Sequence, residues 1–293
     1  MNKITVFTPT YNRGYVIDRL ADSLLKQTDC HFDWLIIDDG SDDNTEEIIS
    51  EYIKKNPPFR ITYQKVKNGG KQRAINLAVQ QIETEYIFIV DSDDYLTDDA
   101  IERVLKWIDD LPEEFAGVSG ARGKSVDCYL GEVPQISGFY LEATNLERCQ
   151  YNLMSDMAEI YKVQMLKKYP FRVWEGENFV PEATVWDQIA LDGYKLRWYK
   201  DIIYICEYLD DGLTKGSWNL LRKNPMGYAM MYNHMLLTEK SGRTNIAIQM
   251  VSCLCLGKNF MKIFKSNAPV LALLCSPVGI ALYLRRKRQF KQG

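Results

Sequence analysis

The chain has 293 residues, of which 46% are apolar and 26% charged, a composition typical of a folded protein rather than a disordered one. It contains two histidines, seven scattered cysteines and no Cys-x-x-Cys pair, which argues against a Cys/His zinc site. The formal net charge is −3, but residues 1–240 hold 27 basic and 39 acidic residues, whereas residues 241–293 hold nine basic residues and no acid. An acidic body with a basic tail indicates that the tail meets an anionic surface, either a membrane or a nucleic acid.

Strand and helix patterns alternate along the first hundred residues. Buried-strand patterns are found at 3–10, 32–39, 60–66 and 86–90. Helical patterns follow them at 16–27, 43–55, 69–82 and 97–108. This alternation indicates βαβ units and a mostly parallel sheet. The patterns weaken over 117–169, and after Leu220 the chain is helical in character.

Polar residues follow each of the four predicted strands. The strand ends read TPTYN, DDGSDDNT, KNGGK and DSDD. Ligands of such sheets bind outside the carboxyl ends of the strands. The sequence therefore predicts one ligand site at this edge.

Three carboxylates, Asp91, Asp93 and Asp94, follow the fourth strand within four residues, with Ser92 among them. Like charges this close are unfavourable unless a cation lies between them. Asp91 and Asp93 can ligate a hard divalent cation, which can also hold two phosphates. The alternative is a cluster that caps the next helix, although the Thr-Asp pair that follows already supplies that cap.

The first two strand ends carry groups that suit a nucleotide. Pro9 fixes the exit of the first strand, Tyr11 offers a ring for base stacking, and Arg13 offers a cation for phosphate. Asp39 ends the second strand, where its carboxylate can accept a hydrogen bond from a nucleobase. The alternative for both stretches is ordinary turn chemistry.

The third strand end combines glycines with cations at the start of a helix. Asn68, Gly69 and Gly70 permit close backbone approach, and Lys71 and Arg73 follow them. Neither the P-loop spacing nor a G-x-G-x-x-G stretch after the first strand is present. A P-loop site and a Rossmann dinucleotide site are therefore disfavoured.

The stretches TPTYNR, IIDDGSDDNT, NGGKQRAIN and DSDD, in this order, resemble the family 2 glycosyltransferases of the GT-A fold. The resemblance is strong over 1–110 and looser over 111–210. It implies an α/β GT-A fold with a central, mostly parallel sheet, and transfer of a sugar from a nucleotide donor, usually a UDP-sugar, with inversion and with Mn²⁺ or Mg²⁺. We expect a catalytic domain over 1–220, with a nucleotide-sugar half (1–110) and an acceptor half (111–220), and a helical region over 221–293.

The same resemblance implies roles for individual residues. Asp93 would bind the metal directly with help from Asp91, which would lie nearer the ribose, and Asp94 would lie on the acceptor side or cap the helix. Asp39 would meet the uracil. The donor site as a whole would consist of Thr8, Pro9, Tyr11, Arg13, Asp39, Asn68, Gly69, Lys71, Arg73, Asp91 and Ser92.

Displacement at an anomeric carbon also needs a base that takes the acceptor's hydroxyl proton. The family carries an acidic pair on a helix ahead of a Trp and a Tyr-Lys strand, and FVPEATVWDQIALDGYKL matches that arrangement here. Alignment on Tyr194 and Lys195 places Glu182 where the family has its catalytic Asp. Asp187 is the rival, about 140° away around a helix. The alternative for Glu182 is an ordinary acid at a helix N-terminus after Pro181.

The tail contains 19 uncharged residues, Ser266–Leu284, with basic residues on both sides. As a helix this stretch would be about 28 Å long, slightly less than the roughly 30 Å hydrocarbon core of a bilayer. We expect Pro269 and Pro277 to interrupt it. Basic flanks on both sides favour a helix in the cytoplasmic leaflet, with residues 244–291 on the cytoplasmic membrane surface. The alternatives are a helical subdomain, an oligomer interface and a single span.

These observations together predict an enzyme, cytoplasmic and peripheral on the inner face of the cell membrane. It would transfer a sugar from a nucleotide sugar to a lipid-linked or polysaccharide acceptor in bacterial cell-surface glycan synthesis. Nucleic acid is not an expected partner, and the oligomeric state stays open. One alternative is a nucleotidyltransferase, although TPTYNRG lacks the Gly-rich basic signature expected there. The other is a protein that binds sugar nucleotides without catalysis.

Overall fold

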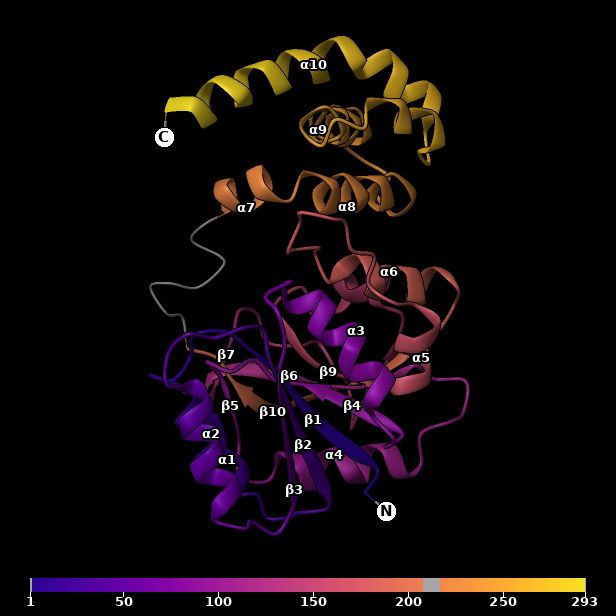
Figure 1. The fold of residues 1–293 in the computed structure, drawn as a ribbon. Helices are drawn as coiled ribbons and strands as arrows, with labels where there is room; N and C mark the ends of the chain where they lie inside the picture. Colours follow the sequence, from indigo (N-terminus) through magenta and orange to yellow (C-terminus); the bar gives the residue numbers. More distant parts are fainter. Residues whose placement is uncertain (1, 208–216, 293) are drawn as a thin grey trace. The chain divides into compact units, whose positions relative to one another are not determined.

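The computed structural model describes residues 2–207 and 217–292 and divides the chain into two compact units (Figure 1). The first, the sheet unit, comprises Met1–Pro170 and Ile189–Leu209. The second, the helical unit, comprises Phe171–Gln188 and Asp210–Gly293. The helical unit thus takes in residues 171–188, which the predicted boundary at 220 assigns to the catalytic domain.

Within the described residues, the strands of the sheet unit join in one mixed sheet. Their bounds are β1 (Ile4–Thr10), β2 (Phe32–Asp38), β3 (Arg60–Lys65), β4 (Tyr86–Ile89), β5 (Tyr95–Leu96), β6 (Gly117–Ser125), β7 (Cys128–Tyr129), β8 (Leu141–Ala143), β9 (Met157–Lys162) and β10 (Leu196–Ile205). The order is β3-β2-β1-β4-β9-β6-β10-β5, with β7 on β6 and β8 on β10. The first four of these neighbours are parallel, as the alternating pattern predicts, and β9 is antiparallel to both β4 and β6.

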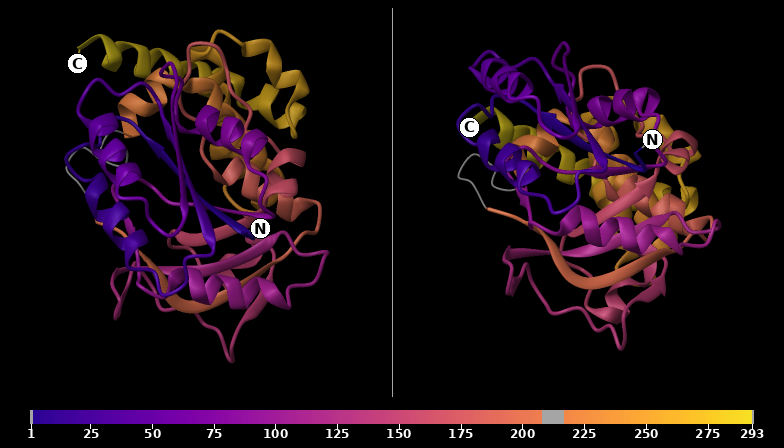
Figure 2. Two further views of the ribbon diagram at one scale, coloured as in Figure 1. Left: turned by 60° about the horizontal axis from the view of Figure 1, so that its bottom comes forward. Right: turned by 90° about the horizontal axis from the view of Figure 1, so that it is seen from below.

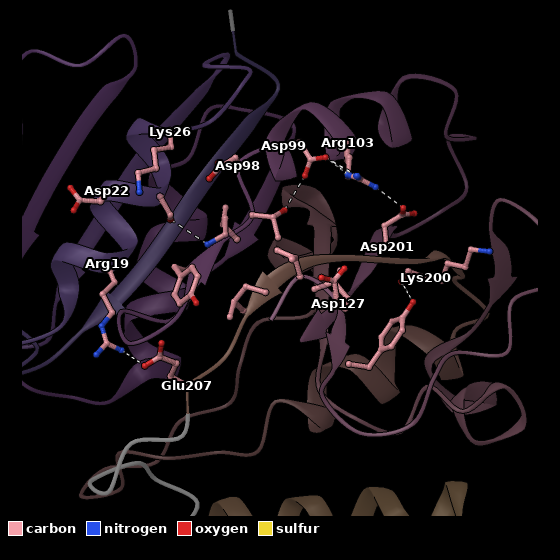
Figure 3. A pocket seen from close by; sticks show the side chains of 18 residues that line it. Arg19, Asp22, Lys26, Asp98, Asp99, Arg103, Asp127, Lys200, Asp201 and Glu207 are labelled. Atoms are coloured by element: carbon pink, nitrogen blue, oxygen red, sulfur yellow. Dashed lines mark hydrogen bonds and ion pairs between the residues drawn. The ribbon is translucent and has the colours of Figure 1, made fainter. Parts of the chain in front are cut away.

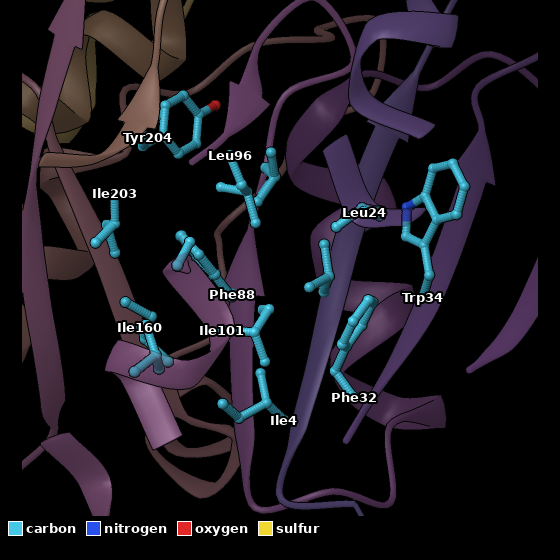
Figure 4. Packing of buried hydrophobic residues seen from close by; sticks show 14 of the residues in the cluster. Ile4, Leu24, Phe32, Trp34, Phe88, Leu96, Ile101, Ile160, Ile203 and Tyr204 are labelled. Carbon is cyan, nitrogen blue, oxygen red and sulfur yellow. The ribbon is translucent and has the colours of Figure 1, made fainter. Parts of the chain in front are cut away.

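Helices cover both faces of this sheet (Figures 1 and 2). They are α1 (Ile17–Leu25), α2 (Thr45–Lys54), α3 (Lys71–Gln81), α4 (Ala100–Asp109) and α5 (Val163–Lys168), with a 3₁₀ turn η1 (Asn145–Tyr151). Apolar residues of α1, α2 and α4 share one buried cluster with alternate residues of β1, β2, β4 and β9, in which Phe32, Trp34 and Phe88 are almost fully buried (Figure 4). Helix α3 packs beside β1, β2 and α5. The predicted βαβ architecture of the first hundred residues is confirmed.

The helical unit has its own apolar core. Its helices are α7 (Ser217–Lys223), α8 (Pro225–Thr238), α9 (Arg243–Leu256) and α10 (Pro269–Gln292), with a 3₁₀ helix η3 (Phe260–Lys265) before α10. It also includes helix α6 (Ala183–Leu191) as far as Gln188; the last turn of α6 belongs to the sheet unit. Helices α9 and α10 approach closely at Gly279, where a Cβ would lie 2.6 Å from Val251 Cγ1. Glu177 closes the start of α8, because its two carboxylate oxygens accept from the amides of Met226 and Gly227 at 2.8 and 2.9 Å.

Helix α10 differs from the prediction for this stretch. Pro269 is its first residue, a position that proline favours, but the helix continues through Pro277. The expected interruption at Pro277 is therefore wrong. By length and composition, Pro269–Phe290 is the one helix among the described residues that is long and apolar enough to cross a membrane.

The exposed face of α10 is more apolar than its buried face. The inward side presents small or polar residues such as Ala272, Ser276 and Gly279, together with the buried Arg286. Arg286 donates to Ser252 Oγ at 3.0 Å and to Gln249 Oε1 at 2.6 Å, which joins α10 to α9. The exposed apolar residues of α10 are Val270, Leu273, Leu274, Val278, Ile280 and Leu284. A soluble helix normally shows the opposite arrangement.

His234 on α8 makes the stability of the helical unit depend on pH. Its Nδ1 is buried with no hydrogen-bond partner among the described residues, and burial lowers the pKa of the imidazole below its usual value near 6.5. Below pH 6.5 the unfolded chain therefore binds the proton more readily than the folded one. We expect the free energy of unfolding to fall as the pH drops from 6.5 through the folded-state pKa, by about 1.4 kcal/mol per unit of pKa lowering.

Urea titrations at pH 7.5 and pH 5.5 measure this effect. His234→Gln should remove part of the pH dependence of unfolding of the helical unit. His31→Gln, at an exposed histidine of the sheet unit that pairs with Asp29 at 2.8 Å, should leave the pH dependence of the helical unit as in the wild type. Equal pH dependence in all three proteins would contradict the assignment.

Candidate active site

Strand register brings the predicted site residues of the sheet unit to one edge. Thr10 lies opposite Asp38 in the β1–β2 pair, and Asp38 lies opposite Lys65 in the β2–β3 pair. Val90, just past β4, donates to the carbonyl of Phe7 at 2.9 Å. The carboxyl ends of β1, β2, β3 and β4 therefore meet, and the loops that follow them are neighbours.

The loops after β1 and β2 are joined by hydrogen bonds. Asn12, in the left-handed conformation at φ 51°, donates its amide to Ser41 Oγ and accepts from the amide of Asp42 through its side chain. Asp43 accepts from the amide of Gly14 at 2.9 Å. A Cβ on Gly14 would lie 2.1 Å from Asn44 Oδ1, so any larger residue there would displace the Asn44 side chain. Much of the DDGSDDNT stretch thus serves to hold the TPTYNRG loop in place.

Asp39 is engaged with the NGG loop. Its two oxygens accept from the amides of Gly69 and Gly70, each at 2.7 Å, and the side chain is buried. Burial raises the pKa of Asp39, and the two amides offset part of that rise. Each oxygen keeps a further lone pair. Contact between Asp39 and a uracil N–H stays a prediction. The structure adds a second role that the sequence did not reveal, because Asp39 also fixes the loop before α3.

We expect Asp39→Asn to weaken binding of the predicted nucleotide ligand by about 10–100-fold, because the new amide group would face one of the two glycine amides and leave it unpaired, a loss of about 1–3 kcal/mol. Titration calorimetry with UDP measures this. Asp42→Asn, at an exposed position in the same loop, is the matched control and should bind UDP as the wild type does. Unchanged UDP affinity in Asp39→Asn would contradict a role for this clamp.

The acids after β4 are partly neutralised by cations from other loops. Lys71 Nζ lies 2.6 Å from Asp91 Oδ1, and Arg13 Nε lies 3.9 Å from Asp93 Oδ2. Burial alone would raise the pKa of Asp91, but Lys71 and Arg122 outweigh it, and the pKa lies below its usual value. Burial and the neighbouring Asp91 raise the pKa of Asp93. The two carboxylates thus differ, and Asp93 carries the charge that is less well compensated.

Asp94 is hydrogen-bonded to β10 and to the residues that follow it. Its Oδ2 accepts from the Tyr204 hydroxyl at 2.8 Å, its Oδ1 accepts from the amide of Glu207 at 3.3 Å, and Arg122 lies 4.0 Å away. The same Tyr204 oxygen accepts from the amide of Asp91 at 2.9 Å. Burial and Asp91 raise the pKa of Asp94 to about 6. The carboxylate of Asp94 therefore does not cap the following helix, one of the two roles expected for it.

Arg122 and Tyr204 are the site residues that the sequence reading missed. Arg122 stands in β6 among small uncharged residues, donates Nε–H to the Met157 carbonyl at 2.8 Å and stacks 4.0 Å from the Tyr204 ring. Tyr204, on β10, is fully buried. The one available signal was a charged residue inside the SGARG strand pattern.

The remaining predicted donor residues differ in exposure. Thr8 is fully buried and its hydroxyl accepts from Trp34 Nε1 at 3.0 Å, so it shapes the start of the loop rather than presenting a group to solvent. Pro9 and Ser92 are also buried, whereas Tyr11 is 47% exposed and its ring is available for stacking. Asn68 is exposed, and Arg73 donates to the Gly69 carbonyl from the first turn of α3.

The site chemistry fits a divalent cation that is shared with a ligand. Among residues 2–207 and 217–292 no group of three or more His, Cys, Asp or Glu is arranged around one point. Mg²⁺ and related ions commonly take only one or two carboxylates and complete their shell with phosphate oxygens and water. Asp93 and Asp91 supply such a pair, and burial together with the neighbouring Asp91 raises the pKa of Asp93, a penalty on its charged form that a bound cation would relieve.

The two candidate bases belong to the helical unit. Glu182 directly precedes α6, and its carbonyl accepts from the amides of Val185 and Trp186 at 2.9 and 3.2 Å. Asp187 lies within α6, and both side chains are half-buried. These positions do not identify which of the two acids is the catalytic base, and the choice of Glu182 over Asp187 stays a prediction.

A separate hollow of about 1180 Å³ in the sheet unit includes none of the predicted site residues (Figure 3). Half of its ten charged side chains pair with one another: Arg19 with Glu207, and Arg103 with both Asp99 and Asp201. We place the chemistry at the carboxyl edge instead, because the predicted donor residues meet there.

The sequence matches known proteins over its first half. The model of the family described as Glycosyl transferase family 2 matches residues 5–169. The chain is 42% identical over 103 residues to a chondroitin synthase of Pasteurella multocida (strain Pm70), which covers 35% of this chain and 10% of that protein. It is 31% identical over 144 residues to the poly(ribitol-phosphate) beta-N-acetylglucosaminyltransferase TarS of Staphylococcus aureus (strain Mu50 / ATCC 700699), which covers 47% and 25%. The chain thus spans a quarter or less of these two relatives.

Solved structures share the fold over nearly the whole chain. Residues 1–349 of S. aureus TarS in complex with UDP-GlcNAc align with a TM-score of 0.62 at 18% identity, over 99% of this chain and 92% of that one. The mannosyltransferase PcManGT from Pyrobaculum calidifontis, in complex with GDP-Man and Mn²⁺, aligns with a TM-score of 0.59 at 17% identity, over 98% and 82%. The predicted GT-A fold is confirmed.

Proposed function

Because the chain belongs to glycosyl transferase family 2, we propose that it transfers a glycosyl group, with inversion, from a nucleotide sugar to a lipid-linked or polysaccharide acceptor in bacterial surface-glycan synthesis. The observation that carries this is the set of four strand-end loops at one sheet edge, with carboxylates, cations and an exposed tyrosine ring together. A UDP-linked donor is favoured, since the neighbouring TarS structure holds UDP-GlcNAc. A role in surface glycans is supported by the names of relatives, which include a putative teichuronic acid biosynthesis glycosyltransferase, TuaG, of Bacillus subtilis (strain 168).

The chain's own residues would divide the work of binding. Tyr11 would stack on the base, and Arg13 and Lys71 would neutralise the diphosphate. Asp91 and Asp93 would hold a divalent ion, Mn²⁺ or Mg²⁺, which when bound would stabilise the charge of the leaving diphosphate. Arg122 and Tyr204 would hold the DSDD turn in position from the other half of the sheet.

A base must take the proton of the acceptor hydroxyl as the new glycosidic bond forms. Glu182 is our choice on the motif, with Asp187 as the rival. Inversion follows if the acceptor oxygen displaces the nucleotide directly, in a single step without a covalent intermediate on the protein.

A screen of nucleotide sugars for metal-dependent hydrolysis tests the proposal. We expect release of UDP from at least one UDP-sugar, and loss of that release when EDTA removes the metal. Release of pyrophosphate from a nucleoside triphosphate and a sugar phosphate would instead identify a nucleotidyltransferase. Tight donor binding without turnover of any donor, with or without acceptors, would identify a binding protein.

We further propose that the helical unit rests on the cytoplasmic face of the membrane through α10. The exposed apolar face of that helix ends in the basic run from Arg285 to Arg288, and residues 241–293 contain no acid. Apolar residues beside Lys and Arg are the usual pattern of helices that lie in an anionic membrane surface.

The double change Leu273→Asp and Leu274→Asp should lower binding to anionic vesicles about tenfold or more, because each side chain is over half exposed and loses its apolar burial in the bilayer. Vesicle sedimentation measures this. Val126→Asp with Val133→Asp, at exposed positions of the sheet unit, adds the same charge and is the matched control. Equal loss in both double variants would attribute the effect to net charge alone and contradict the proposal.

A further inference from the structure

A cavity of about 790 Å³ lies within the helical unit, a size typical of pockets that hold small organic ligands. Its walls come from α8, α9, the turn after α9 and η3, with Trp174 and Tyr283 from other parts of the same unit. None of the residues assigned to the donor site or to the base lines it. The cavity is therefore distinct, in its residues, from the predicted donor site and base.

The interior of the cavity is apolar and adaptable. Trp174, Met226, Met250, Leu254 and Phe260 contribute to its lining. Methionine side chains adjust to irregular apolar groups more readily than branched ones do. The uncharged polar side chains of Asn233, Asn259 and Ser266 also line the cavity, but each already bonds to a backbone group of the same unit. The lining therefore suits a flexible hydrocarbon chain better than a sugar ring, which would need hydrogen-bonding groups along its edges.

Four cations complete the lining, which contains no acidic residue. They are Arg172, Lys258, Lys262 and Lys265. Over the described parts of the chain, none of the four lies within ion-pair distance of a carboxylate; Arg172 instead stacks 5.4 Å from the Trp174 ring. Uncompensated positive charge beside an apolar cavity complements an anion that carries a hydrocarbon chain.

Lys258 occupies its position at a conformational cost. It follows α9 with φ of 56°, the left-handed conformation in which glycine or asparagine usually stands. Its amide and that of Asn259 bond back to the carbonyls of Cys255 and Leu254 at 3.1 and 2.8 Å, so the turn is well formed. Glycine would fit this turn without strain, and a lysine there adds a cation to the cavity lining.

We propose that this cavity binds a phosphate-bearing lipid, with a hydrocarbon chain among the methionine and aromatic side chains and the phosphate beside Lys258, Lys262 and Lys265. The proposal concerns lipid binding alone and holds whichever acceptor receives the sugar. It is also separate from the contact of α10 with a membrane surface, since a single lipid monomer in solution should occupy the cavity.

Titration calorimetry of the full chain with dodecyl phosphate below its micelle concentration tests the proposal. We expect one molecule per chain. Lys262→Gln with Lys265→Gln should weaken binding about tenfold or more through loss of charge-assisted hydrogen bonds. Lys223→Gln with Lys240→Gln removes the same charge from exposed positions of the helical unit outside the cavity and should bind as the wild type does.

Two further variants separate binding from folding. Lys258→Gly should keep or raise the melting temperature, because glycine suits the left-handed turn, and yet weaken dodecyl phosphate binding. Met230→Trp should fill the cavity and abolish binding. The proposal is overturned if Lys258→Gly and the Lys262/Lys265 double variant bind dodecyl phosphate with wild-type affinity, or if dodecyl maltoside or inorganic phosphate binds equally well.

Displacement experiments distinguish the two sources of such a lipid. Farnesyl phosphate displaces dodecyl phosphate if the cavity takes single-chain isoprenoid phosphates, and a short-chain phosphatidylglycerol displaces it if the cavity takes bilayer phospholipids. Displacement by either supports the proposal and names the source. Displacement by neither overturns it.

Discussion

Asp93→Asn is expected to reduce the rate of UDP release from the donor by about 10²–10³-fold, the usual cost of removing one group that stabilises developing charge. Of the two carboxylates expected to hold the metal, Asp93 is the one whose negative charge is less compensated, because Arg13 is 3.9 Å away whereas Lys71 lies 2.6 Å from Asp91. A cation entering the site therefore gains most from Asp93. An amide oxygen keeps the shape of the carboxylate but loses the charge.

Initial rates over a Mn²⁺ titration measure this prediction. Asp98→Asn is the matched control, because Asp98 is exposed and lies in the same segment between β4 and α4. We expect the concentration of Mn²⁺ needed for half-maximal rate to rise in Asp93→Asn and to stay unchanged in Asp98→Asn. Wild-type metal dependence in Asp93→Asn would assign the metal elsewhere.

The edge of the sheet was predictable because its determinants are local. The change from a buried-strand pattern to an amphipathic-helix pattern identifies each βαβ unit in the sequence. Parallel strands then place their carboxyl ends at the same edge of the sheet. Tyr11, Arg13, Lys71 and Asp93 all lie within a few residues of a strand end, so sequence position alone brings them to the site.

The supports of the site were not predictable because they are distant in sequence. Tyr204 is 110 residues from Asp94, and the pairing of β10 with the two-residue strand β5 brings them together. A strand of two residues has no periodicity to detect. Arg122 also reaches the site through long-range pairing, because β6 is positioned by its pairing with β9 and β10.

The hydrogen-bond partners within the site could not be predicted from the sequence either. Asp39 follows the second strand as predicted, yet only the fold shows that both of its oxygens meet the amides of Gly69 and Gly70. The helical stretch after Pro269 shows the converse, since a proline at position 277 is tolerated where a helix is held by its neighbour α9.

Glu182→Gln is expected to lower kcat by about 10²–10⁴-fold while UDP-sugar affinity stays within a factor of about two, because a glutamine can hold the acceptor hydroxyl but cannot take its proton. Asp187→Asn should have a smaller effect, since the motif places the base at Glu182, which directly precedes α6, whereas Asp187 lies inside the helix. The pair of variants thus decides between the two acids.

Single-turnover transfer to acceptor and calorimetric donor binding give the two readouts. Glu175→Gln, at an exposed acid of the same unit, is the control for loss of one negative charge and should leave both unchanged. A large loss of kcat in Asp187→Asn alone would move the base to that residue. If neither variant lowers transfer while the donor still binds, the base is not on this helix, and the proton must leave the acceptor by another route.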